Sequence, residues 1–251
     1  MTSALLTDDP ASGVRRLTLN RPERLNAMSR ALAAELIAAL DAASADSSVR
    51  VLIIRGAGRA FCAGADLSEQ HTGTDTEPDI GVSGLWERME AARFPIIGAV
   101  HGWAMTGGFL LAYSCDLLVA SEDAIFQDTH AKLGLIPTGG ESQRMPRRLG
   151  LHLARELMLT SRPLSAREAK DAGLVSAVVA RDELDAAALR MAQAIADNVP
   201  RAVETIKRMI NVGIGMDFAT GLRYEAISNQ FGAANQVADP ERDRRTAKFR
   251  R

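Results

Sequence analysis

The chain has 251 residues, of which 47% are hydrophobic and 24% charged, a balance typical of a globular protein with a sizeable core. Its 30 lysines and arginines nearly balance its 31 aspartates and glutamates, which argues against binding to nucleic acid or an anionic membrane through bulk charge. No apolar run approaches the ~20 residues that cross a bilayer, and the N-terminus lacks a secretory pattern, so we expect a cytoplasmic protein.

Strand and helix patterns alternate through the first half of the chain. Most of the predicted strands are continuous apolar runs, which are typical of strands buried on both faces of a parallel sheet. The first predicted helix has Ser29 as its N-cap and apolar side chains at 3.6-residue spacing. The predicted strands are 14–19, 49–54, 95–100, 116–120 and 124–126, and the predicted helices are 29–43, 85–92 and 107–115. This order indicates an α/β core.

Helix patterns dominate the last hundred residues. Ser165 and Glu168 match a capping box at the start of one of these helices. We therefore divide the chain into an α/β core at 1–195 and a helical region at 196–251. The polar, glycine-containing segment 68–84 is predicted to be a mobile loop over a site. The predicted helices are 147–159, 165–172, 183–196, 200–211 and 217–231.

Two glycine-rich turns each follow a predicted buried strand. They are 61–66 (FCAGAD) and 101–108 (HGWAMTGG), and the second leads into a helix. Glycine allows the backbone to approach a ligand closely, and a helix N-terminus has unpaired N–H donors. Each turn alone could be a tight connection only. Side by side, the two turns could direct two N–H groups at one carbonyl oxygen, which is an oxyanion hole. The phosphate-binding glycine motifs are absent from the sequence.

The order of these and other short motifs resembles the crotonase (enoyl-CoA hydratase/isomerase) superfamily over nearly the whole chain. This resemblance implies a core of stacked ββα turns in a superhelix, a helical C-terminal region that takes part in trimerisation, and a homotrimer or a dimer of trimers. It also implies an acyl-CoA thioester as the substrate, with no separate cofactor. The motifs are Asn20–Glu23, Ala60–Leu67, Pro95–Gly102, Gly107–Gly108, Cys115–Asp116, Gly134–Pro137, Ser142–Arg144, Leu164–Ala166, Glu168–Ala169 and Ala172–Val175.

The resemblance further implies which residues form the acyl-CoA site. The thioester oxygen would lie between the N–H groups of Ala63 and Gly107, and Asp66 would be a structural helix-start residue beside the pocket. Lys248 and Phe249, in a basic C-terminal run, would lie near the CoA nucleotide, although a solvated tail is the alternative. The remaining residues expected to contact the substrate are Gly64, Ala65, Leu67, Gly108, Leu110 and Thr138.

The sequence departs from the family pattern where hydratases carry two glutamates that hold a water molecule. Leu110 and His130 occupy the matching positions. Leucine cannot transfer a proton, whereas histidine is a competent acid or base. Asp128 could orient the imidazole, because residues i and i+2 of an extended segment point the same way. Glu141, which opens a predicted helix, is a second candidate for proton transfer.

The sequence leaves several functions open. The first is an enoyl-CoA hydratase or isomerase with weak hydration of simple enoyl-CoA. A second is another acyl-CoA reaction that uses His130, such as C–C hydrolysis, decarboxylation or thioester hydrolysis, and a third is a non-catalytic acyl-CoA-binding protein. His101 is expected to be structural, no spacing suggests a metal, and Cys62 and Cys115 are expected to be reduced and packed.

Overall fold

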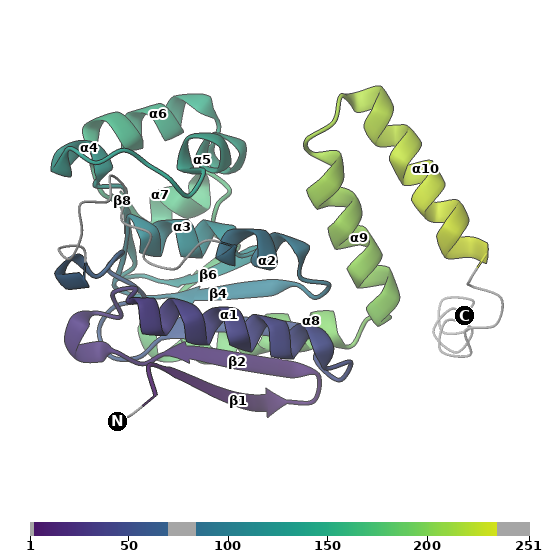
Figure 1. Cartoon of the computed structure of the whole chain (residues 1–251), viewed down its shortest axis with the longest axis horizontal. Helices are drawn as coiled ribbons and strands as arrows, with labels where there is room; N and C mark the ends of the chain where they lie inside the picture. Colours follow the sequence, from purple (N-terminus) through teal and green to yellow (C-terminus); the bar gives the residue numbers. More distant parts are fainter. Residues whose placement is uncertain (1–2, 70–83, 235–251) are drawn as a thin grey trace.

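The computed structural model describes residues 3–69 and 84–234 (Figure 1). Its main body contains a six-stranded sheet. The strand order is β1-β2-β3-β4-β6-β9, and all neighbouring pairs are parallel except β1 with β2. The strands are β1 (Leu5–Ala11), β2 (Val14–Leu19), β3 (Val51–Gly56), β4 (Ile96–Val100), β6 (Leu117–Ser121) and β9 (Ala177–Val179).

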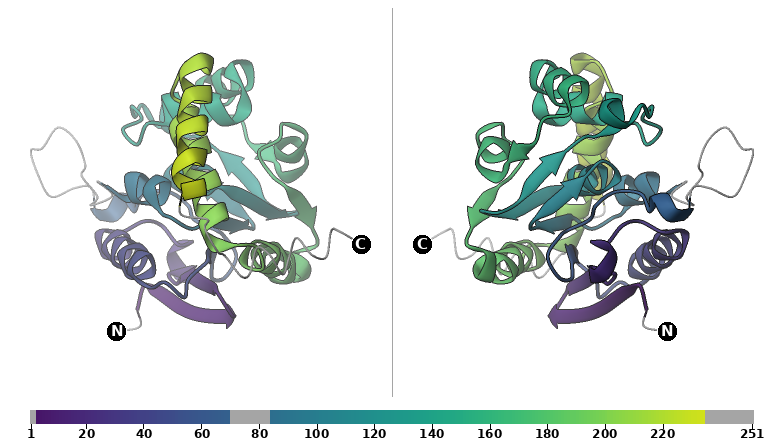
Figure 2. Two further views of the ribbon diagram at one scale, coloured as in Figure 1. Left: turned by 90° about the vertical axis from the view of Figure 1, so that its right-hand side faces the viewer. Right: turned by 90° about the vertical axis from the view of Figure 1, so that its left-hand side faces the viewer.

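Helices cover both faces of this sheet (Figure 2). Apolar side chains of the central strands, among them Ile53, Ile97 and Val119, pack in one cluster with Ala188 and Ala192 of α8. The opposite face packs against α1, α2 and α3 in a larger cluster. This two-sided burial explains why the central strands are continuous apolar runs. The helices are α1 (Arg30–Ala45), α2 (Leu85–Ala91), α3 (Gly107–Ser114) and α8 (Leu184–Ala196).

A second, three-stranded sheet positions the candidate site. It consists of β5 (Trp103–Met105), β7 (Ile125–Gln127) and β8 (Leu164–Ser165). Strands β5 and β7 are parallel, and Met105 pairs with Gln127. The residues that follow these two strands therefore emerge at the same edge. Helices α4 (His130–Leu133), α5 (Glu141–Leu149), α6 (Leu151–Thr160) and α7 (Ala166–Asp171) complete this part.

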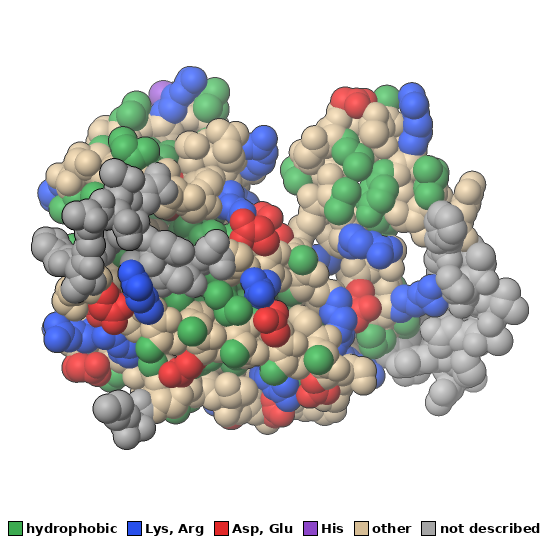
Figure 3. All heavy atoms as spheres, viewed as in Figure 1, with side chains coloured by type: hydrophobic (Ala, Val, Ile, Leu, Met, Phe, Trp, Pro, Cys, Tyr) green, Lys and Arg blue, Asp and Glu red, His purple; other side chains and the backbone are tan. Residues whose placement is uncertain are grey.

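Helices α9 (Pro200–Gly213) and α10 (Phe218–Ala234) form a hairpin beside the main body (Figure 1). The buried Lys207 joins α9 to the body: its Nζ lies 2.8 Å from a carboxylate oxygen of Asp116 and donates to the carbonyl of Phe94 at 2.9 Å. Large apolar side chains remain exposed on the hairpin, including Ile210 and Phe218, and hydrophobic groups are visible over it in Figure 3.

The structure confirms the α/β fold with a helical C-terminal region and corrects several element predictions. The single helix predicted at 147–159 was wrong, because Gly150, with a positive φ of 78°, separates α5 from α6. Strand β1 was missed because Asp8, Asp9 and Pro10 hide the strand pattern. Charges and proline are, however, common on an edge strand. The predicted N-cap of α1 and the capping box of α7 are both present.

Three further predictions have different outcomes. Both cysteines are free and buried, as expected. Most of the predicted loop 68–84 and the two CoA-contact candidates Lys248 and Phe249 lie outside the described residues. The division at 195/196 falls at the end of α8, and the independence of the two parts stays a prediction.

Candidate active site

The two glycine-rich turns lie side by side. Cys62 and Ala104 form an isolated parallel bridge, in which the Cys62 N–H donates to the Trp103 carbonyl and the Met105 N–H donates to the Cys62 carbonyl, both at 3.0 Å. A Cβ atom on Gly108 would lie 2.0 Å from the Cys62 carbonyl oxygen. The second turn therefore requires glycine at 108, because any side chain would push the two turns apart.

The N–H of Ala63 cannot serve as an oxyanion donor in this structure, which corrects the sequence-based assignment. It donates to the carbonyl of Leu25 at 3.0 Å. Leu25 belongs to residues 21–28, which we call the brace, and which also bind the neighbouring peptide groups. The Met28 N–H donates to the Gly64 carbonyl at 2.7 Å, and the Asp66 N–H donates to the Met28 carbonyl at 2.9 Å.

The N–H of Ala65 faces away from the brace. The C=O and N–H of one trans peptide point in opposite directions, and the carbonyl of the Gly64–Ala65 peptide points at Met28. The Ala65 nitrogen lies on the side of Gly107, 3.6 Å from the position that a Cβ of Gly107 would take. Neither the Ala65 nor the Gly107 N–H has a hydrogen-bond acceptor among the described residues. Two unpaired amides, from residues that are both partly exposed, therefore lie near each other.

Gly107 is the first residue of α3, so its N–H is one of the donors that a helix leaves unpaired. The residue before it, Thr106, has a positive φ of 49°, a conformation that costs a non-glycine residue about 1–3 kcal/mol. The Thr106 hydroxyl holds this turn against the end of β7, because it lies 2.5 Å from the Thr129 hydroxyl and accepts from the Thr129 N–H at 3.3 Å.

His130 lies next to this contact and is held by Asp128. A single carboxylate oxygen of Asp128 accepts from the His130 backbone N–H at 2.9 Å and lies 2.8 Å from Nδ1 of the imidazole. The expected contact is present, but its predicted cause was wrong. Residues 128–130 are not extended: His130 starts α4, and Thr129 has φ −108° and ψ 6°. A turn, rather than strand alternation, brings the two side chains together.

Glu141 approaches the other side of the imidazole. It opens α5, as predicted, and its Oε1 lies 3.9 Å from Nε2 of His130. The side chains of Asp128 and Glu141 are 2% and 5% exposed, so both carboxylates are nearly removed from water. Burial lowers the pKa of His130, but hydrogen bonding to Asp128 and the charges of Asp128 and Glu141 outweigh it, so the pKa is raised overall. The pair of carboxylates therefore favours the protonated imidazole.

Two buried oxygen atoms near this cluster have no hydrogen-bond partner among the described residues. They are Oε2 of Glu141 and the hydroxyl of Tyr113, which sequence analysis had not singled out. Burial raises the pKa of Tyr113, and the negative charges of Glu141 and Asp128 raise it further, so the phenol stays protonated. Unpartnered buried polar atoms are rare in folded proteins and mark a place where a ligand could bind.

The other predicted site residues differ in how they are placed. Leu110 is buried, and a Cβ atom on Gly139 would lie 2.3 Å from its Cδ2 atom, so Leu110 packs closely against the Gly139 turn. Asp66 is structural in the described chain: Arg21 pairs with it at 2.8 Å, and the Ser68 hydroxyl donates to it at 2.6 Å. Leu67 and Thr138 are exposed.

His101, expected to be structural, is buried away from solvent. Its Nε2 lies 3.1 Å from the Gly58 carbonyl. Burial lowers the pKa of His101, and the positive charges of Arg181 and Arg55 lower it further.

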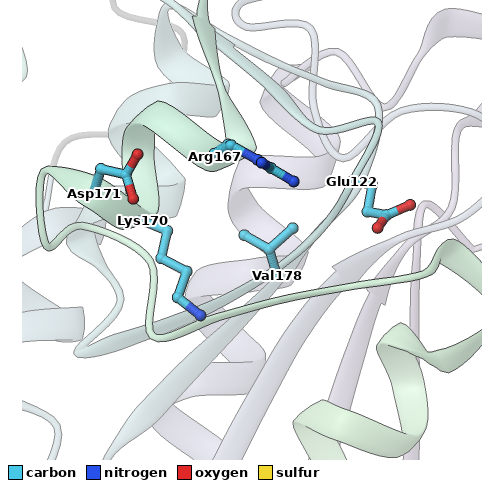
Figure 4. Close-up of a pocket in the computed structure, with 5 residues that line it drawn as sticks. All are labelled: Glu122, Arg167, Lys170, Asp171 and Val178. Atoms are coloured by element: carbon cyan, nitrogen blue, oxygen red, sulfur yellow. The ribbon is translucent and has the colours of Figure 1, made fainter.

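A cavity of about 570 Å³ lies in another part of the molecule, between α7, the end of β6 and β9 (Figure 4). Its lining is largely charged and includes none of the residues of the two turns or of the His130 cluster. It is lined by Glu122, Arg167, Lys170, Asp171 and Val178. Within residues 3–69 and 84–234, no three His, Cys, Asp or Glu side chains are grouped closely enough to hold a metal ion. No helix in those ranges is both long and apolar enough to cross a bilayer.

Comparisons with known proteins place this chain in a family. The profile described as enoyl-CoA hydratase/isomerase matches residues 9–239. A probable peroxisomal enoyl-CoA hydratase of Arabidopsis thaliana is 40% identical over 222 residues, which are 86% of this chain and 81% of that protein. The chain belongs to the enoyl-CoA hydratase/isomerase family, in the crotonase superfamily.

Solved structures agree with this assignment. The crystal structure of an enoyl-CoA hydratase from Bacillus anthracis superposes with a TM-score of 0.91 at 36% identity, covering 99% of this chain and 97% of that one. A monofunctional enoyl-CoA isomerase from M. smegmatis superposes with a TM-score of 0.77 at 33% identity, covering 88% of this chain and 98% of that one.

Sequence reasoning missed Ala65 as a free donor, Tyr113, and the link between Thr106 and Thr129. The carbonyl and the N–H of the Gly64–Ala65 peptide point in opposite directions, which identifies the Ala65 N–H as a free donor. This inference is possible only when the Gly64 carbonyl is known to bind the brace. Nothing in the local sequence indicates that the hydroxyls of Thr106 and Thr129, 23 residues apart, meet.

Proposed function

We propose that the protein transfers a proton on an enoyl-CoA thioester, shifting its double bond. The N–H groups of Ala65 and Gly107 would bind the thioester oxygen, and His130 would be the acid and base. The observation that carries this proposal is an imidazole held between two buried carboxylates and tied, through Thr129 and Thr106, to the turn that presents the Gly107 amide.

The proton transfer starts from neutral His130. Its Nε2, on the side away from Asp128, takes a proton from the carbon next to the thioester or from the vinylogous position. The electron pair moves to the thioester oxygen, and two N–H donors stabilise the resulting enolate, typically by a few kcal/mol each. The raised pKa of His130 favours this uptake, because Asp128 and Glu141 stabilise the imidazolium. Return of the proton to the other end of the delocalised system completes an isomerisation.

We favour isomerisation over rapid hydration because of the residue at position 110. Hydration by this family uses a second carboxylate to hold water, and the corresponding position is the buried, apolar Leu110. A proton shuttle needs one group that both removes and returns the proton, and His130 meets that need. The relative named as a monofunctional enoyl-CoA isomerase is consistent with this choice.

The test compares two reactions in one set of variants. Conversion of a 3-enoyl-CoA to the 2-enoyl-CoA and hydration of crotonyl-CoA are measured for the wild type, His130→Ala and Glu141→Gln, with His152→Ala on the exposed face of α6 as the control. We expect isomerisation to exceed hydration, to fall about 10²–10⁴-fold in His130→Ala, and to be unchanged in His152→Ala. Isomerisation that survives in His130→Ala contradicts the assignment of the base.

Two other outcomes would redirect the proposal. Hydration that depends on both His130 and Glu141 would mean that these two side chains hold the water together. Tight acyl-CoA binding in calorimetry, with no turnover and no exchange of α-hydrogens with D2O, would support the non-catalytic binding protein instead. A homotrimeric or hexameric assembly, a cytoplasmic location and a reaction that needs no cofactor besides the CoA thioester stay predictions.

A further inference from the structure

The brace, residues 21–28, forms hydrogen bonds with the peptide groups of segment 63–66 that face it. The carbonyl of Leu25, the N–H of Met28 and the carbonyl of Met28 bind Ala63, Gly64 and Asp66 in turn. What these bonds leave free is the Ala65 N–H, which points to the opposite side. The direction of this donor is therefore set by the position of the brace and not by the substrate.

The conformation of the brace is unusual and needs support. Leu25 and Asn26, neither of them glycine, have positive φ values of 52° and 56°. Such residues are uncommon, and the left-handed conformation persists where surrounding contacts enforce it. Asparagine tolerates this conformation better than most residues, whereas leucine does not. The contacts of Asn26 supply the enforcement.

Asn26 is fully buried and binds three backbone groups from two segments. Its Oδ1 accepts from the Arg21 N–H at 2.9 Å, which closes the brace upon itself. Its Nδ2 donates to the carbonyls of Ala57 and Ala60, both at 2.8 Å. These two carbonyls belong to the loop between β3 and the first glycine turn, so Asn26 fixes the brace to the entrance of that turn.

We infer that Asn26 is a positioning residue for the oxyanion hole: it fixes the brace so that the Ala65 N–H points at the thioester oxygen beside Gly107. This inference rests on the proposed function, because it assigns Asn26 a part in that same site. Asn26 is fully buried and does not touch the substrate. It acts through Leu25 and Met28, and its loss changes the direction of a donor, not the affinity for CoA.

The informative variant is Asn26→Asp, which has nearly the same size. Aspartate keeps the acceptor for the Arg21 N–H, but it loses both donors and places a carboxylate against the carbonyl oxygens of Ala57 and Ala60. Asn26→Ala removes all three bonds and is the second variant. The matched control is Asn20→Ala, in the same part of the chain, because the Asn20 side-chain amide donates to the exposed Ser3 carbonyl at 3.0 Å and does not contact the first glycine turn among the described residues.

Two measurements separate positioning from general loss of structure. The first is the 13C resonance of the carbonyl in bound butyryl-CoA labelled at the thioester carbon, which is recorded only from folded, ligand-bound protein. We expect the displacement from its free value to shrink in both Asn26 variants and to be unchanged in Asn20→Ala. The second is turnover, where we expect kcat to fall about 10–100-fold, less than the 10²–10³-fold for complete loss of one donor, with KM changed less than about threefold.

Hydrogen exchange keeps failure of the inference distinct from failure of the proposed function. In the unliganded protein, exchange in a peptide containing residues 61–66 should become faster in the Asn26 variants, because Ala63 and Asp66 lose their acceptors. A wild-type carbonyl resonance that does not move on binding would remove the oxyanion hole and leave the brace intact. A normal displacement in wild type that persists unchanged in folded Asn26→Asp, with kcat unchanged, would overturn the role of Asn26.

Discussion

Replacement of Asp128 by asparagine tests the charge that acts on His130. The two side chains are 2% and 13% exposed, and one oxygen of Asp128 binds both the imidazole Nδ1 and the His130 N–H. Asparagine offers an oxygen of the same shape in the same place, so both hydrogen bonds can persist. The variant removes the negative charge and leaves the turn that starts α4 in place.

The magnitude follows from the difference between a charged and a neutral hydrogen bond. A hydrogen bond to a charged group contributes about 1.5–3 kcal/mol, and a neutral one about 0.5–1.5 kcal/mol. Partial burial adds to the Coulombic part, because it screens the charge less than water does. A loss of about 1–3 kcal/mol in stabilising the imidazolium in the transition state corresponds to a decrease in kcat of about 5–150-fold.

The direction of the pH effect follows from the raised pKa of His130. The hydrogen bond and charge of Asp128 raise the pKa of His130 against the opposing effect of burial, so their removal lowers it. The base form is the neutral imidazole, and the rise of kcat/KM with pH should therefore occur at lower pH in Asp128→Asn. The assay is the pH profile of double-bond isomerisation from pH 5 to 9.

The control for this experiment is the same substitution at an exposed ion pair, Asp9→Asn, where the carboxylate is 60% exposed and pairs with Arg15. This variant should keep the wild-type profile. An Asp128→Asn protein with unchanged kcat, or with its profile moved to higher pH, would refute the reasoning about the charge on His130.

Three further predictions concern the packing of the fold. Gly108→Ala should lower the melting temperature and abolish turnover, because its Cβ would lie 2.0 Å from the Cys62 carbonyl oxygen. The control is Gly213→Ala, whose added Cβ would have no neighbouring atom within 4 Å outside its own helix backbone. A Gly108→Ala protein that is active would contradict this packing. Lys207→Met should destabilise the docking of α9 by about 3 kcal/mol, because Asp116 loses its buried ion-pair partner. Limited proteolysis of α9 measures this effect, and an unchanged rate of cleavage would count against it. Ser165→Ala should lower the free energy of unfolding by about 1 kcal/mol in urea titrations, through loss of the α7 cap, with activity retained.

The sequence by itself determined the local features of this protein. Apolar runs identified β3, β4 and β6, and Ser29 and Ser165 marked the starts of α1 and α7, because burial and capping are properties of neighbouring residues. The glycine-rich turns and His130 were also recognised from the sequence, together with their resemblance to the crotonase superfamily.

Tertiary structure decided which chemical groups of those residues are free to act. Ala63 and Ala65 are the same residue type, but the brace accepts a hydrogen bond from the N–H of Ala63 and leaves the N–H of Ala65 unpaired. Asp128 meets His130 through a turn, and Glu141 reaches it from another helix. Each hydrogen bond occupies one donor and one acceptor, and here the acceptor of each donor is set by contacts between segments far apart in the chain. For that reason, which donors remain unpaired is a property of the whole fold.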